Sequence, residues 1–286
     1  MTVGTLGSGI RLLRRGPAVL VLAVLAELVA SALVAGLTIV LIAFIVGWIA
    51  GIGPAAPWLP AITAAGGALW VTLLVGFLIR CLARAGVIAA LGQLASSGRV
   101  DSTAFLGGAA RLVDRIAVLS CVEALFLHGG IALAAAGLMT DRPATAAGAV
   151  ALAMAFAAAG ALWAAAASAG LAVDGEQDVA TCLFNGARLL GARLEQVARL
   201  AAAVGLASVG ITACAIGLDA FTGLMMSHPI LAGPGLLLGG CLQILYVVAG
   251  TAVALAGWAG LVELARSLLL PERLDPAADG VDLAVP

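Results

Sequence analysis

The sequence has few charged residues and no lysine. Charged side chains make up 10% of its 286 residues, whereas 63% of the residues are hydrophobic. A soluble domain carries about 25% charged residues, so this composition excludes a water-soluble protein and favours a chain surrounded mainly by lipid. The net charge of −1 argues against a nucleic-acid partner. Without lysine there is no P-loop nucleotide site.

The sequence also lacks the motifs of common active sites and metal sites. There is neither a GxSxG nucleophile elbow nor an HExxH zinc helix. None of the five cysteines belongs to a CxxC pair, and four lie in or beside apolar runs, where a thiol behaves as a small hydrophobe. A haem with two histidine ligands is not expected, because the only partner for His128 is His228, in a connecting segment. We therefore predict no enzyme activity, no cofactor and no metal.

What the sequence does contain is long apolar runs separated by arginines. Uncharged stretches cover 28–79, 143–173 and 220–262, and thirteen of the fourteen arginines lie at alternate connections, with only Arg142 at an intervening turn. This pattern is the positive-inside signature of a membrane protein with several spans. It predicts a bacterial cytoplasmic (inner) membrane protein with both termini in the cytoplasm. A single domain of residues 1–270 is expected, followed by a flexible tail, 271–286. The expected spans are 18–49, 61–82, 116–139, 145–170, 197–218 and 235–262.

Related short segments precede the odd-numbered spans, at residues 6–13, 106–113 and 184–190, and Ala-Gly pairs end the even-numbered spans. These features predict an internal repeat, used three times, of an amphipathic cytoplasmic helix, a span out, a turn and a span back. The fold class is then all-α: a polytopic bundle of six transmembrane helices in three hairpins. Alternatively, the short segments are the cytoplasmic ends of longer spans. The predicted apolar faces are Phe105, Ala109, Leu112 and Ile116, and Leu183, Ala187, Leu190, Leu194 and Val197.

Small residues are frequent in the predicted spans. The fourth span is rich in alanine, and we expect it inside the bundle because small side chains let helix backbones approach closely. Two pairs of glycines have GxxxG spacing, Gly47 with Gly51 and Gly235 with Gly239. Such pairs indicate either a specific dimer contact or packing within the bundle.

Glu27 and Glu123 are the only carboxylates well within apolar runs, and His128 follows five residues after Glu123. A charge at the centre of a bilayer costs at least ~2.5–3.5 kcal/mol. One interpretation is an intramembrane polar site for protons or a cation, shared by both glutamates, with His128 as a relay. The other is that each glutamate reaches a cytoplasmic arginine or a helix N-terminus, and that His128 is a satisfied residue in the bundle interior.

The segment 85–90, together with Gly98, Ser102, Phe105 and Arg111, resembles a loose group of uncharacterised bacterial six-span proteins. The group includes the membrane domain attached to some glycerophosphoryl diester phosphodiesterases. This resemblance implies a helical membrane module over nearly the whole chain. The phosphodiesterase activity does not carry over, because the sequence contains no such domain.

Two functions follow from these observations. The low polar content and the many small residues favour a non-catalytic scaffold or accessory subunit that packs against other membrane proteins. The alternative is a small-solute or lipid transporter, or permease, that uses Glu27 and Glu123. In both cases the expected partners are the lipid bilayer and other membrane-protein subunits.

Overall fold

The computed structural model describes residues 4–51, 58–140, 142–228 and 230–269, and within these ranges all regular structure is α-helical. The chain is therefore all-α, as predicted. Its helices are α1 (Gly4–Arg15), α2 (Pro17–Gly51), α3 (Trp58–Ser97), α4 (Ser102–Leu138), α5 (Pro143–Val173), α6 (Val179–Met226) and α7 (Ala232–Leu269).

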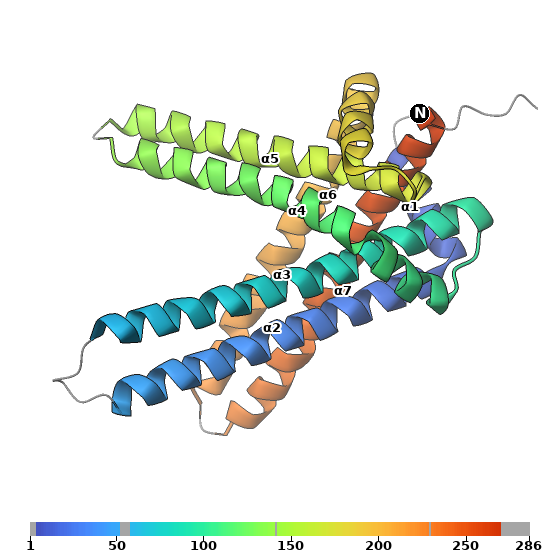
Figure 1. The fold of residues 1–286 in the computed structure, drawn as a ribbon. Coiled ribbons are helices and arrows are strands. Elements are labelled where there is room, and N and C mark those ends of the chain that lie inside the picture. The colour runs from blue at the N-terminus through green and yellow to red at the C-terminus, as the bar shows by residue number, and fades with distance from the viewer. Residues whose placement is uncertain (1–3, 52–57, 141, 229, 270–286) are drawn as a thin grey trace, which may run out of the picture.

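Six of these helices, α2 to α7, are long and apolar enough to cross a membrane. They pair in chain order into three antiparallel hairpins, α2–α3, α4–α5 and α6–α7 (Figure 1). The protein is thus an integral membrane protein whose apolar helices contact the lipid bilayer.

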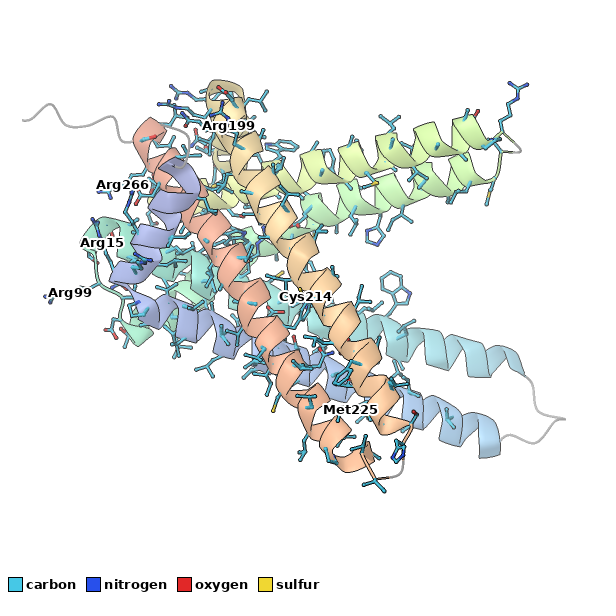
Figure 2. All side chains as sticks on the ribbon, turned by 180° about the vertical axis from the view of Figure 1, so that it is seen from behind. Arg15, Arg99, Arg199, Cys214, Met225 and Arg266 are labelled. Carbon is cyan, nitrogen blue, oxygen red and sulfur yellow. The ribbon has the colours of Figure 1, made fainter. Side chains whose placement is uncertain are left out.

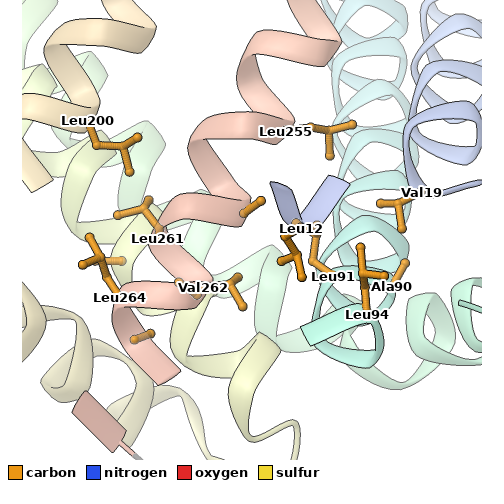
Figure 3. Close-up of a cluster of buried hydrophobic side chains, with 14 of the residues drawn as sticks. Leu12, Val19, Ala90, Leu91, Leu94, Leu200, Leu255, Leu261, Val262 and Leu264 are labelled. Carbon is orange, nitrogen blue, oxygen red and sulfur yellow. The ribbon is translucent and has the colours of Figure 1, made fainter. Parts of the chain in front are cut away.

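The three hairpins meet at one end and diverge toward their turns (Figure 1). Most buried side chains lie at the meeting end, which we call the joint and define as α1 together with residues 85–94, 105–119, 164–171, 182–200 and 255–265. Figure 3 shows part of its core, where Leu12 of α1 lies with Leu91 of α3 and Leu255 of α7. The helix segments beyond the joint are called the arms. The joint contains the contacts that hold the three hairpins together.

A ring of close contacts closes the joint. The segments that begin each hairpin unit are α1 and the N-terminal parts of α4 and α6. Each packs through one glycine on the returning helix of another hairpin. A Cβ atom on these glycines would lie 2.1–2.8 Å from a neighbouring atom, so no larger side chain fits. The pairs are Gly9 with Ala256 of α7, Gly108 with Ala89 of α3, and Gly186 with Ala167 of α5. Each unit thus packs on the one before it, and the first packs on the last.

The three initial segments differ in how they join their spans. The first is the separate helix α1, which ends one residue before Gly16. The second is continuous with α4, so it is the end of a longer span, as the alternative interpretation of the short segments predicts. Asp101 caps the start of α4 by accepting a hydrogen bond from the amide of Thr103. The third is divided from the rest of α6 by a kink at Arg193, whose φ of −132° and ψ of 28° are not helical.

The predicted apolar face of the second segment is confirmed, since Phe105, Ala109, Leu112 and Ile116 are all buried. The predicted face of the third segment is confirmed in part. Val197 is buried, and Leu183 and Leu190 are partly buried and pack against the core, but Ala187 and Leu194 are exposed. The buried face is shifted by about one residue because the small residues Cys182 and Gly186 allow α6 to approach α5. This face is Cys182, Gly186, Leu189 and Val197.

The helices extend beyond the predicted spans. α3 continues to Ser97 rather than ending near residue 82, and the expected connection 219–234 is mostly helical, because α6 ends at Met226 and α7 begins at Ala232. The predicted interior position of the fourth span holds for the part of α5 in the joint, where 166–171 is buried, but residues 155, 158 and 159 in its arm are exposed. The predicted tail, 271–286, lies outside the described residues.

Candidate functional site

A cavity of about 720 Å³ lies where the α2–α3 and α4–α5 hairpins begin to diverge, bordered also by α7. Four charged side chains line it: Glu27 from α2, Arg80 and Arg84 from α3, and Glu123 from α4. Most other lining residues are apolar, among them Phe77 and Leu162. We call this space the charged cavity.

Arg84 is held at the centre of this arrangement by three helices. Its Nη1 atom donates to the Oε2 atom of Glu123 at 2.5 Å. Its guanidinium carbon lies 4.6 Å from the ring centroid of Trp258 in α7, a cation–π contact. The two partly buried charges therefore neutralise each other, and the ion pair joins the first hairpin to the second.

Several polar groups around the cavity lack a partner. The Nε atom of Arg84 is buried and has no hydrogen-bond acceptor within the described ranges, a defect that costs about 1–3 kcal/mol. Glu27 receives only a long hydrogen bond, 3.5 Å, from the hydroxyl of Ser31. Neither Glu27 nor Arg80 forms an ion pair with any described residue. One negative and one positive charge thus remain uncompensated on neighbouring helices.

The charged cavity lies nearer to the joint than to the arm tips. Twenty residues separate Glu27 from Gly47, and twenty separate Pro60 from Arg80. At about 1.5 Å per residue, each interval of helix is about 30 Å long, similar to the thickness of the hydrocarbon core. Arg15, Arg99, Arg199 and Arg266 lie at the end of the molecule where the hairpins meet, far from Met225 at an arm tip (Figure 2). The charged cavity therefore lies toward the arginine-bearing end of the helices.

The structure brings together Glu27 and Glu123 but not His128. Both carboxylates line the charged cavity, and Glu123 in addition reaches an arginine, so each of the two sequence interpretations describes part of the arrangement. His128 does not line the cavity; it is exposed, and its Nδ1 atom lies 2.7 Å from the carbonyl oxygen of Ala124 in the same helix. The interpretation of His128 as an interior residue is wrong.

The glycines with GxxxG spacing have different surroundings. A Cβ on Gly235 would lie 3.1 Å from side-chain atoms of Met225, and one on Gly239 would lie 3.8 Å from Thr222 Oγ1, so both glycines pack within the α6–α7 hairpin. Gly47 has no heavy atom within 4 Å of its Cβ position. Gly51 ends α2, and its surroundings lie outside the described part.

The connection between α5 and α6 lies outside the membrane-spanning segments. Asp178 caps α6 by accepting a hydrogen bond from the amide of Thr181 at 2.7 Å. The hydroxyl of Thr181, and then its amide, lower the pKa of Asp178 from its ordinary value of 3.8. The carbonyl of Gly175 nearby accepts a hydrogen bond from Arg115.

Sequence reasoning missed Arg84 and Trp258 as site residues. Arg84 was grouped with the cytoplasmic arginines, because the uncharged run ends at Ile79. The available signal was that no proline interrupts 61–97, so the helix continues and puts Arg80 and Arg84 on one face, one turn apart. Trp258 gave no signal, since only the packing of α7 brings it to α3.

The fold and the cavity together define an integral membrane helical protein with a charged cavity toward the arginine-bearing end of its helices. No protein-family model matches the chain, and neither a curated protein nor a solved structure matches it. Within the described ranges, no three His, Cys, Asp or Glu side chains come together as a metal site.

Proposed function

We propose that the protein is a lipid-handling permease of the bacterial cytoplasmic membrane, in which the charged cavity receives the headgroup of a lipid. The observation that carries the proposal is that Glu27 and Glu123 line one cavity together with Arg80 and Arg84. Charged residues in membrane-spanning segments are costly and mark substrate pathways more often than other residues do.

The surfaces around the cavity favour a lipid over a water-soluble solute. The arms carry exposed apolar side chains, such as Trp70 and Leu125, which are 75% and 71% exposed. A lipid matches both this apolar surface and the charged end of the cavity. A water-soluble solute would need polar residues along its whole path, but the arms consist largely of uncharged sequence.

The arrangement of the arginines supports an orientation with both termini in the cytoplasm. α1 and the end of α7 lie at the end of the molecule where the hairpins meet, and Arg15 and Arg266 lie there (Figure 2). Cytoplasmic connections carry an excess of arginine and lysine. A reporter active only in the periplasm is expected to be inactive when fused after Val173 and active when inserted at Pro57; the reverse pattern would refute this orientation.

The function is tested by reconstituting the purified protein in liposomes that contain a phospholipid with a fluorescent acyl chain. Dithionite, added outside, quenches only the label that reaches the outer leaflet. The wild-type protein is expected to raise the quenched fraction above that of empty liposomes. Glu27→Gln and Glu123→Gln should each reduce the gain, because each removes a charge from the cavity.

Glu176→Gln is the matched control, since Glu176 forms an exposed ion pair with Arg111 at 3.4 Å, away from the charged cavity. It should translocate lipid as the wild type does. The proposal fails if the wild-type protein moves no lipid, or if both cavity variants move it at the wild-type rate.

The second candidate is the scaffold or accessory subunit favoured by the amino-acid composition. The observation in its favour is the exposed apolar surface of the arms, where Leu237 and Leu206 are more than 70% exposed. Such surface suits either lipid or another membrane protein. Co-purification of a stoichiometric membrane partner in mild detergent, together with inactive liposomes, would favour this candidate over the permease.

A further inference from the structure

The charges that line the cavity leave one site for a cation and one for an anion. Arg84 and Glu123 neutralise each other through their ion pair. Glu27 on α2 and Arg80 on α3 line the same cavity, and neither is paired with a described residue. A ligand that compensates both must carry a positive and a negative group a short distance apart.

We infer that the charged cavity selects a zwitterionic phospholipid, with its ammonium group on Glu27 and its phosphate on Arg80 and Arg84. This inference rests on the proposed function and adds the headgroup class and the residues that determine it. The acyl chains of the lipid lie along the apolar side chains of the diverging arms.

Arg84 is suited to a phosphate because its position is fixed before a ligand binds. Glu123 and Trp258 hold its guanidinium group, and its Nε atom has no acceptor within the described ranges. Guanidinium groups donate to phosphate oxygens in a fork geometry, and Arg80 adds a second positive charge one helical turn away.

Glu27 disfavours a lipid that brings only negative charge. Its carboxylate lies in a cavity with apolar walls, where the attraction of an ammonium group and the repulsion of an anion are both stronger than in water. A phosphatidylglycerol headgroup has the phosphate but not the ammonium, so it would leave Glu27 uncompensated. The preference for an ammonium group is thus assigned to a single side chain.

The cavity walls favour the lipid as the source of this headgroup over a free solute. Phe77, Leu127 and Leu162 line the side toward the arms. An acyl chain buries apolar surface against them, whereas a free headgroup cannot. If the arms span the hydrocarbon core, about 30 Å of helix lies between their tips and the cavity, so the cavity is near the depth at which a phospholipid places its phosphate.

The test is native mass spectrometry of the purified protein with equal amounts of dioleoyl phosphatidylethanolamine and dioleoyl phosphatidylglycerol. The wild type is expected to retain phosphatidylethanolamine about tenfold more strongly, the effect of one charge-assisted interaction. Glycerophosphoethanolamine, which has the same headgroup without acyl chains, should not displace the bound lipid at equal concentration. If it does, the lipid assignment is wrong and the ligand is a soluble zwitterion.

Two variants test the roles of the negative charge of Glu27 and the positive charge of Arg80 separately. Glu27→Gln should abolish the preference, leaving the two lipids within about twofold of each other. Arg80→Gln should weaken both lipids alike, because both carry the phosphate. Glu176→Gln should retain the wild-type preference, and size-exclusion chromatography checks that each variant is folded.

The headgroup inference is overturned if the wild type binds both lipids equally or if Glu27→Gln keeps the preference. These results differ from failure of the proposed function. A protein that moves both lipids equally well, with Glu27→Gln impaired, would remain a permease without the headgroup selectivity. A protein that binds phosphatidylethanolamine selectively but moves no lipid would keep the selectivity and lose the function.

Discussion

The joint and the arms are built from similar residues, rich in alanine, leucine and glycine, but their close contacts join different helices. In the joint, Gly9, Gly92 and Gly186 lie so close to backbone atoms of another hairpin that a Cβ would be 2.1–2.8 Å away. In the arms, Gly160 is as close to Phe126, but within its own hairpin, and Gly36 has no heavy atom within 4 Å of a Cβ position. Small residues therefore permit close packing in both regions, and the close contacts between hairpins are concentrated at one end.

The joint and the arms therefore have different structural roles. The joint fixes the relative positions of the hairpins, while the arms remain free to contact lipid. The charged cavity lies at the border between them, where Arg84 and Glu123 join the first two hairpins just before they diverge.

The largest loss of stability is expected from Gly92→Val, in the joint. A Cβ on Gly92 would lie 2.1 Å from the carbonyl oxygen of Ala172, so α3 and α5 must move apart. We expect a loss of about 3 kcal/mol, the upper end for overpacking, because the obstacle is backbone and cannot rotate away. Thermal unfolding in detergent, followed by size-exclusion chromatography, measures the effect.

Gly36→Val is the matched control in an arm. It makes the same change at a position with open space and should unfold at nearly the wild-type temperature. Equal destabilisation by both variants would show that the joint and the arms do not differ in the way described.

The second-largest loss of stability is expected from Arg84→Gln, at the border between the joint and the arms. Glu123 is then left half-buried without its ion pair, which should cost about 2 kcal/mol, as for other hydrogen bonds to charged groups. Arg111→Gln breaks an exposed pair and should cost less than about 1 kcal/mol. Thermal unfolding compares Arg84→Gln with Arg111→Gln. The coupling energy between Arg84 and Glu123 comes from the losses of Arg84→Gln, Glu123→Gln and the double variant. If Arg84→Gln costs no more than Arg111→Gln, the ion pair does not hold the hairpins.

The sequence predicted the class of the fold but not the division into joint and arms. Apolar runs of about 20 residues, together with arginines at alternate connections, indicate six spans. Five of them lie within long helices, and the third ends one residue beyond α4. Local hydrophobicity cannot indicate where one hairpin touches another. The periodicity predicts a buried Ala187, but this residue is exposed, because Cys182 and the adjacent Gly186 are buried instead and Gly186 packs on Ala167 of α5.

Two of the four charged residues that line the candidate site could be predicted from the sequence. Glu27 and Glu123 are conspicuous because carboxylates are costly in apolar runs, and both line the cavity. His128 stood out for the same reason, but the helix rotation exposes it and pairs it with its own backbone. Arg84 has a sequence environment like that of other arginines, and only the long-range contact with Glu123 distinguishes it.

A smaller effect is expected within an arm, from Gly235→Ala. The added methyl group would lie 3.1 Å from the Cβ of Met225 and the Cγ of Met226, and 3.3 Å from the amide nitrogen of Met226. The Cγ can rotate away, and the Cβ and the amide nitrogen need to shift only slightly, so we expect a loss of about 1 kcal/mol, the lower end for overpacking. Unfolding of Gly240→Ala, where no heavy atom lies within 4 Å, is the comparison. A loss as large as that of Gly92→Val would show that the arm is packed as tightly as the joint.

The smallest effect is expected at the water-facing rim of the joint, where Asp178 begins α6. Its pKa is lowered by hydrogen bonds from the hydroxyl and amide of Thr181. A carboxylate with a lowered folded pKa adds stability above its unfolded pKa, and the gain is lost as pH falls through the folded value. The contribution of Asp178 should therefore be complete at neutral pH and disappear below the ordinary value of 3.8.

Asp178→Asn separates the charge from the capping geometry, because asparagine is also a good N-cap but does not titrate. The wild type should unfold at a slightly higher temperature than Asp178→Asn at neutral pH, and the difference should vanish as pH falls below 3.8. Asp178→Ala, which removes the cap as well, should remain less stable than Asp178→Asn over the whole range. A difference between wild type and Asp178→Asn that does not change with pH would mean that the ionised carboxylate does not stabilise α6. The start of this helix, unlike the glycine contacts deeper in the joint, would then be held by packing alone.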